Sequence, residues 1–133
     1  MNTTTITGNA TDAPTVRFLE GGQAVCGFTV AHTPRSRTAD GNWVDGQTSY
    51  LKVTVWGAYA ENTADSVAKG DRVIVTGRLQ EHTFTATRGE RHGQEVRRIE
   101  MVADEVGLST KWATVKATTT TTRGSKGDAE DEG

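Results

Sequence analysis

The stretch Tyr-Leu-Lys-Val-Thr-Val-Trp, residues 50–56, alternates between two kinds of side chain. Successive side chains of a β-strand point to opposite faces, so the three aliphatic residues can enter a core while Tyr50, Lys52 and Trp56 line the other surface. Aromatic rings beside an ammonium group suit a ligand with flat rings and negative charge, such as an unpaired nucleic acid strand. Rings that cover a second hydrophobic layer would give the same pattern, so the strand alone leaves both interpretations open.

The length of 133 residues suits one folded domain with an appended segment. No apolar run approaches the roughly 20 residues that span a bilayer, and the first residues lack the pattern of a signal peptide, so we expect a cytoplasmic protein. The lone Cys26 alternates with Phe28 and Val30, which predicts a small buried hydrophobic residue rather than a disulfide or zinc ligand.

Charge is distributed unevenly along the chain. Residues 1–107 carry 11 basic and 13 acidic residues, residues 108–127 carry four basic and no acidic ones, and the last six carry four acidic ones. The sequence therefore predicts a mildly acidic domain, a basic connector and an acidic end. Any affinity for nucleic acid has to come from local basic clusters, because the whole domain is not basic.

Threonine and valine are frequent and turn signals recur, which favours a mostly β architecture. The predicted strands are residues 3–9, 15–19, 24–32, 50–56, 72–80, 82–88, 96–101 and 102–108. The polar segment 35–47, with its Asp40-Gly41 hairpin signal, predicts a long β-hairpin arm whose tip carries Trp43.

Between the strands, Ala60, Ala64, Val67 and Ala68 have helical spacing, and Lys69-Gly70 closes the predicted helix. Five principal strands, with one short helix between the third and the fourth, follow the order of an OB-fold. This is an all-β, partly open Greek-key barrel whose face and loops commonly bind oligonucleotides or oligosaccharides.

Short motifs along the chain occur in a recognisable order. They are Gly8-Asn9, Val16-Arg17-Phe18, residues 21–25, Val55-Trp56-Gly57, Ala60-Glu61-Asn62, residues 69–73, Gly77-Arg78-Leu79 and residues 103–106. Together they resemble the bacterial single-stranded DNA-binding protein (SSB) family over residues 1–108. The resemblance implies a homotetramer of OB-folds around which single-stranded DNA wraps, without sequence specificity, during replication, recombination or repair.

The resemblance also implies stacking aromatics, three of which correspond to Tyr50, Trp56 and Phe84. At the fourth position, on the arm, this chain has Ser36 between Arg35 and Arg37. The departure suggests that phosphate contacts, or Trp43 farther along the arm, replace stacking there. The remaining predicted DNA-binding residues are basic: Arg17, Lys52, Lys69, Arg72, Arg78, Arg88, Arg97 and Arg98. Such residues displace counterions from phosphates, so affinity should fall as salt rises.

Residues 107–116 resemble the extension of actinobacterial members, which implies a clamp strand at residues 109–117 that holds neighbouring subunits. Lys111, Trp112 and Thr114 would then lie in an oligomer interface. Packing of Trp112 against its own barrel is the alternative.

Residues 118–133 are rich in threonine, glycine and charge, and are predicted to be disordered. The acidic end lacks the proline and phenylalanine of the hydrophobic tip that is typical of the family. We therefore expect weak recruitment of replication and repair proteins, as in a paralogous or mobile-element-encoded member. A purely solubilising tail is the alternative.

An enzyme is not expected. His32, His82 and His92 lack zinc spacing, and neither a nucleophile elbow nor a phosphate-binding loop occurs, so no metal or cofactor is predicted. The competing function is an OB-fold module for RNA, or for protein contacts within a replication or recombination assembly.

Overall fold

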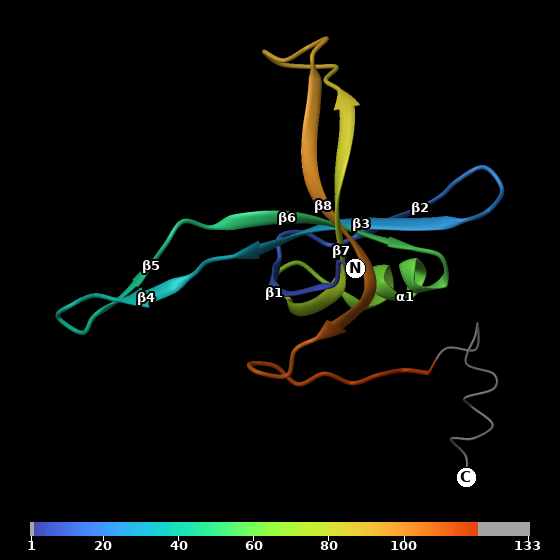
Figure 1. Cartoon of the computed structure of the whole chain (residues 1–133). Helices are drawn as coiled ribbons and strands as arrows, with labels where there is room; N and C mark the ends of the chain where they lie inside the picture. Colours follow the sequence, from blue (N-terminus) through green and yellow to red (C-terminus); the bar gives the residue numbers. More distant parts are fainter. Residues whose placement is uncertain (1, 120–133) are drawn as a thin grey trace.

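The computed structural model describes residues 2–119, which form a barrel with two projecting hairpins (Figure 1). The elements in chain order are β1 (Thr4–Ala10), β2 (Thr15–Phe18), β3 (Ala24–His32), β4 (Arg35–Arg37), β5 (Trp43–Asp45), β6 (Ser49–Trp56), α1 (Ala58–Ser66), β7 (Arg72–Thr85) and β8 (Glu95–Leu108). The chain is thus mostly β with one short helix, as predicted.

The main sheet closes on itself. Its strand order is β1-β7-β8-β6-β3-β2, and a further pairing of β1 with β3 completes the barrel. β6 and β8 pair in parallel, whereas the other pairs are antiparallel. The predicted OB-fold is therefore confirmed in its strand order and in the place of its helix between the third and fourth principal strands.

The core consists mainly of aliphatic side chains, together with Phe28, that point inward from alternate positions of the strands. Val53 and Val55 of β6 are buried, as the alternation of residues 50–56 predicts. They pack in one cluster with Val75 of β7 and Met101 of β8. Cys26 is buried as expected, and burial raises the pKa of its thiol. The rigid interior lies directly beneath the outward-facing residues of β6, β7 and β8.

The sequence analysis was wrong about the number of late strands. Residues 72–80 and 82–88 belong to one strand, β7, which ends at Thr85, and the two predicted strands from 96 to 108 form β8. A register shift at Thr76/Gly77 bends the pair. A Cβ at Gly77 would overlap the Val102 carbonyl oxygen and lie 2.8 Å from the Ala103 Cα, so this close approach requires glycine.

The helix also ends earlier than predicted. α1 stops at Ser66, and Val67 adopts extended backbone while its side chain stays buried in the core. The apparent helical spacing of Val67 reflects the burial of its side chain in the core rather than a further helical turn, and Ala68 is exposed.

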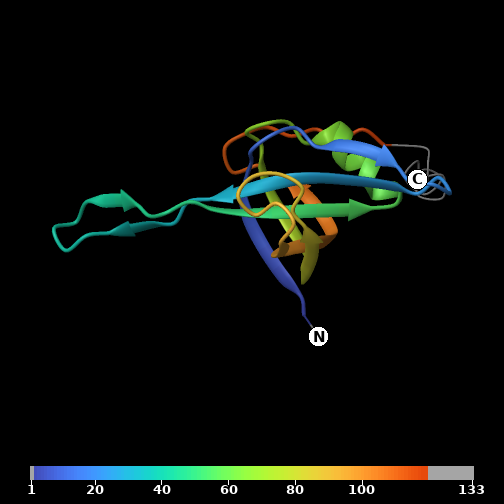
Figure 2. The ribbon, with the colours of Figure 1, turned by 90° about the horizontal axis from the view of Figure 1, so that it is seen from above.

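Two hairpins leave the barrel in different directions. β4 and β5 form the end of the arm, which extends away from the body of the barrel (Figure 2). The outer halves of β7 and β8 form the second hairpin (Figure 1). None of the described residues forms a helix long and apolar enough to cross a membrane.

The segment that follows the barrel differs from the expected extra C-terminal strand. Residues 109–117 contain no strand within this single chain, although the Ser109 amide donates a hydrogen bond to the Arg72 carbonyl. A strand needs a free sheet edge, and the clamp strand was expected to form on a neighbouring subunit, so its pairing there stays a prediction. The predicted disordered tail lies outside the described residues from 120 onward.

Candidate nucleic-acid interface

A hollow of about 550 Å³ lies across the outer face of β2, β3, β6, β7 and β8 and is called the groove below. It is lined by Arg17, Val25, Lys52, Thr54, Trp56, Gln80, His82, Phe84, Arg98, Glu100 and Val102. Five of these residues were predicted to bind DNA: Arg17, Lys52, Trp56, Phe84 and Arg98. The fold therefore brings together two aromatic rings and three basic groups that are far apart in sequence.

Strand register explains why these residues meet. Arg17 of β2 lies opposite Val25 of β3, and Val25 lies opposite Trp56 of β6, so the three form one row across the sheet. Side chains in such rows share a face. Trp56 remains 41% exposed, which leaves ring surface open to a ligand.

The lysine of β6 depends on a neighbouring glycine. A Cβ at Gly27 would lie only 3.1 Å from the Lys52 Cε, so the lysine stem crosses the sheet where β3 has no side chain. Lys52 is also in register with Glu100 of β8. The lysine side chain thus passes over Gly27 of β3 on one side and lies next to Glu100 of β8 on the other.

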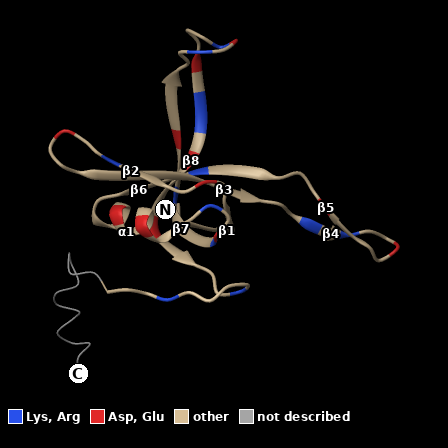
Figure 3. Ribbon diagram, turned by 180° about the vertical axis from the view of Figure 1, so that it is seen from behind, with Lys and Arg blue, Asp and Glu red and all other residues tan. Residues whose placement is uncertain are grey.

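Phe84 sits between polar and cationic groups on the β7–β8 hairpin. The His82 ring stacks on it, with centroids 5.8 Å apart and planes inclined by 25°. The Arg98 guanidinium lies 5.0 Å from the Phe84 centroid. This half-buried ring is therefore held in place while its surroundings are basic, as Figure 3 shows for the outer part of β8.

One acidic side chain also lines the groove. The Thr54 hydroxyl donates a hydrogen bond of 3.4 Å to Glu100 Oε1, and Glu100 is half-buried. A fixed carboxylate here opposes the binding of phosphate and weakens the net positive field of the groove.

The arm carries a second cluster of the same chemistry. The guanidinium groups of Arg35 and Arg37 lie 5.6 and 5.5 Å from the Trp43 ring. Arg35 Nε also forms an ion pair of 3.1 Å with Asp45 Oδ1. These contacts occur between side chains that are all exposed, so the cluster has no core beneath it.

Tyr50 lies apart from the groove. It shares the outward face of β6 with Trp56, but the six intervening steps along the strand separate the two by roughly 20 Å. Tyr50 lines a different, mainly apolar hollow together with Ile6, Leu79 and Ile99. The structure therefore brings only two of the three predicted stacking aromatics into one groove.

Three predicted arginines do not line the groove. Arg78 follows the alternation of Gln80 and His82, so it shares their face of β7 but does not line the hollow. Arg97 lies on the opposite face from Arg98, because the two are adjacent in β8. Arg88 is exposed in the loop at the end of the hairpin.

The remaining predicted residues gather near the start of β7. Lys69 is exposed in the preceding turn, and the Arg72 guanidinium lies 4.7 Å from the Trp112 ring. Lys111 Nζ lies 5.0 Å from the same ring. Trp112 thus contacts its own barrel, although it remains 70% exposed.

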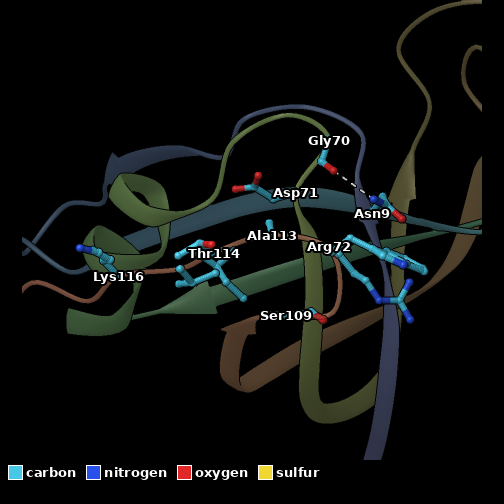
Figure 4. Close-up of a pocket in the computed structure, with 11 residues that line it drawn as sticks. Asn9, Gly70, Asp71, Arg72, Ser109, Ala113, Thr114 and Lys116 are labelled. Atoms are coloured by element: carbon cyan, nitrogen blue, oxygen red, sulfur yellow. Dashed lines mark hydrogen bonds between the residues drawn. The ribbon is translucent and has the colours of Figure 1, made fainter.

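Figure 4 shows the pocket formed where the chain leaves β8. It includes Asn9, whose side chain donates a hydrogen bond of 3.0 Å to the Gly70 carbonyl, and Thr114 of the C-terminal segment. Along β7, roughly 40 Å of strand separate this region from Phe84, so Lys69 and Arg72 belong to a different part of the surface.

Four polar residues of the groove were not predicted from the sequence: Thr54, Gln80, His82 and Glu100. Gln80 and His82 share the parity of Phe84 along β7, and Glu100 shares that of Arg98 along β8. This signal was present in the sequence, but a strand break placed after Gln80 concealed it. Within residues 2–119, no group of histidine, cysteine or acidic side chains is arranged to hold a metal ion.

Comparison with known proteins gives a consistent result. Residues 1–109 match the model of the single-strand binding protein family. A single-stranded DNA-binding protein of Paenarthrobacter aurescens is 40% identical over 126 residues, covering 94% of this chain and 71% of the relative. One from Mycolicibacterium smegmatis is 43% identical over 115 residues, covering 86% and 67%.

A solved structure agrees with the sequence comparisons. The crystal structure of a small single-stranded DNA-binding protein from Streptomyces coelicolor superposes with a TM-score of 0.67 at 30% identity. The match covers 81% of this chain and 94% of that chain.

Proposed function

Because this chain belongs to the single-strand binding protein family, whose members are binding proteins rather than enzymes, we propose that it binds single-stranded DNA without sequence specificity. It would cover unpaired strands during replication, recombination or repair. The observation that carries the proposal is the groove, in which Trp56 and Phe84 lie among Arg17, Lys52 and Arg98.

Bases stack on Trp56 and Phe84 in the proposed complex. Stacking contributes about 1–3 kcal/mol per base and differs little between bases, because every base presents a π-face. Arg17, Lys52 and Arg98 bind phosphates and release counterions. Duplex DNA keeps its bases stacked on one another, so the same groove discriminates against it.

Contacts beyond the groove extend the path of the strand. We assign stacking or phosphate contacts on the arm to Trp43, Arg35 and Arg37, whose rings and charges are exposed. The other proposed contacts outside the groove are Tyr50, Arg78, Arg88 and Arg97, with Lys69 and Arg72 for a strand that continues around the barrel.

The proposed assembly is a homotetramer. The hollow beside Tyr50 exposes apolar groups such as Ile99, which is consistent with a covered surface in the oligomer. In this assembly Lys111, Trp112 and Thr114 would contact a neighbouring subunit. Light scattering should give four chains per particle, and a monomeric mass would contradict the assembly.

We propose that the protein acts in the bacterial cytoplasm, where nucleoid DNA lies.

Titration with oligothymidine tests the function directly. The chain contains three tryptophans, and binding should quench their fluorescence with an affinity that decreases steeply with salt. Duplex DNA and an RNA of matched sequence serve as competitors. Absence of quenching and of strand retention at low salt would refute DNA binding, and tighter binding of the RNA would favour the alternative function.

A further inference from the structure

His82 is the one imidazole in the groove, and the proposed function so far gives it no role. It is exposed on the outward face of β7, two residues before Phe84. Its ring is nearly parallel to that of Phe84, at 5.8 Å between centroids. The pair therefore presents two adjacent rings rather than one.

The charged groups around His82 come from several strands. Arg98 of β8 lies directly opposite it in register. Arg17 of β2, Lys52 of β6 and Glu100 of β8 line the same groove. His82 thus lies among three permanent cations and one carboxylate, where a phosphate of bound DNA would pass.

We propose that His82 is a DNA-contacting residue, whose ring extends the stacking surface of Phe84 and whose protonated form binds a phosphate. The inference rests on the proposed binding of single-stranded DNA. A neutral imidazole can stack but carries no charge, whereas the imidazolium adds a fourth cation to the groove.

The direction of the pH effect follows from linkage. Bound phosphate stabilises the imidazolium, so binding takes up a proton when the free protein is neutral at this site. The imidazolium is the acidic form of the ring, so affinity should be greater at acidic pH than at alkaline pH. Lysine and arginine keep their charge over this range, so the groove has no other cation that would be lost.

The test compares binding of oligothymidine at about pH 5.5 and about pH 8, because thymine does not take up a proton between them. The unmodified chain should bind roughly three- to eightfold more tightly at the lower pH in low salt, the effect of one further neutralised phosphate. The slope of log affinity against log salt should be steeper there by about 0.7.

Two substitutions of His82 distinguish the contribution of its stacking ring from that of its positive charge. His82→Gln should abolish both the pH dependence and the change in salt slope. His82→Phe should also abolish them, yet keep or increase affinity at the higher pH because it retains a stacking ring. Circular dichroism and light scattering at both pH values check that the variants keep their fold and assembly.

His92→Gln is the matched control, because His92 lies in the hairpin loop and outside the groove. This variant should keep the full pH dependence. Tight binding that does not change with pH, or a pH dependence that survives in His82→Gln, would overturn the role of His82 while leaving the proposed function intact. Failure of the unmodified chain to bind at either pH would instead refute the proposed function itself.

Discussion

The groove and the arm carry similar side chains, but they differ in whether a buried core supports them. Both place a tryptophan near arginine or lysine, Trp56 in the groove and Trp43 on the arm. The barrel part of the groove, with Lys52 and Trp56, rests on strands whose other faces are buried, and Val53 and Met101 are fully inaccessible there, whereas Phe84 lies on the projecting β7–β8 hairpin. The arm has no interior, since every residue from 32 to 47 is exposed.

This difference predicts how each region contributes to binding. Core packing fixes Trp56 and its neighbours on the barrel before the ligand arrives, so little conformational entropy is lost there on binding. The arm is held mainly by backbone pairing, cation–π contacts and one exposed ion pair, which contribute little individually. We therefore expect the groove to supply most of the affinity and the arm to adapt to the path of the strand.

The largest effect is expected from a substitution at Gly77, where β7 and β8 approach each other closely. Gly77→Ala would force β7 and β8 apart at the bulge and should lower the free energy of unfolding by about 1–3 kcal/mol, the usual cost of overpacking. Urea denaturation at equal protein concentration measures this.

Gly107→Ala is its matched control in the same strand pair. The nearest atom to a Cβ there is the Ile74 carbonyl oxygen at 4.0 Å, so this substitution should leave stability nearly unchanged. Equal effects of the two substitutions would show that the close approach at Gly77 is not limiting.

The next prediction compares the removal of one tryptophan ring from each region. Trp56→Ala should weaken oligothymidine binding by about 1–3 kcal/mol, because it removes a stacking platform held by the core. Trp43→Ala should cost less than about 1 kcal/mol, because its ring is exposed and must be ordered on binding. Fluorescence anisotropy of labelled oligothymidine measures both, and a larger loss for Trp43→Ala would reverse the proposed ranking.

The smallest effects come from neutralising one acidic residue in each region. Glu100→Gln should tighten binding roughly two- to threefold at low salt, because a half-buried carboxylate no longer opposes phosphate. Asp45→Asn should change affinity by less than about twofold, because its ion pair with Arg35 is exposed and screened. Both differences should vanish at high salt, and weaker binding of Glu100→Gln would mean that Glu100 organises the groove instead of opposing the ligand.

The alternation of residues along single strands predicted much of the fold. The strand at 24–32 was predicted with its observed bounds, and the core positions of β6 were predicted from residues 50–56 alone. The join between 80 and 82 was missed, because polar residues continue β7 where it leaves the barrel and has no core to cover.

The candidate site was predicted in part. Trp56, Phe84 and three cations lie in one groove, whereas Tyr50, Lys69 and Arg72 lie elsewhere on the surface. Residue type and spacing indicated which side chains suit DNA. They did not indicate which of them meet, because that depends on the register between strands distant in sequence.

The sequence by itself determined the place of the helix among the principal strands, the core faces and the family resemblance, since these follow from alternation, turn residues and motifs read along the chain. Only the tertiary structure decided that His82 joins Phe84, that Glu100 enters a basic groove, and that Tyr50 lines a separate hollow. The physical reason is that hydrophobic pattern sets which face of a strand is buried, whereas closure of the barrel sets which strands become neighbours.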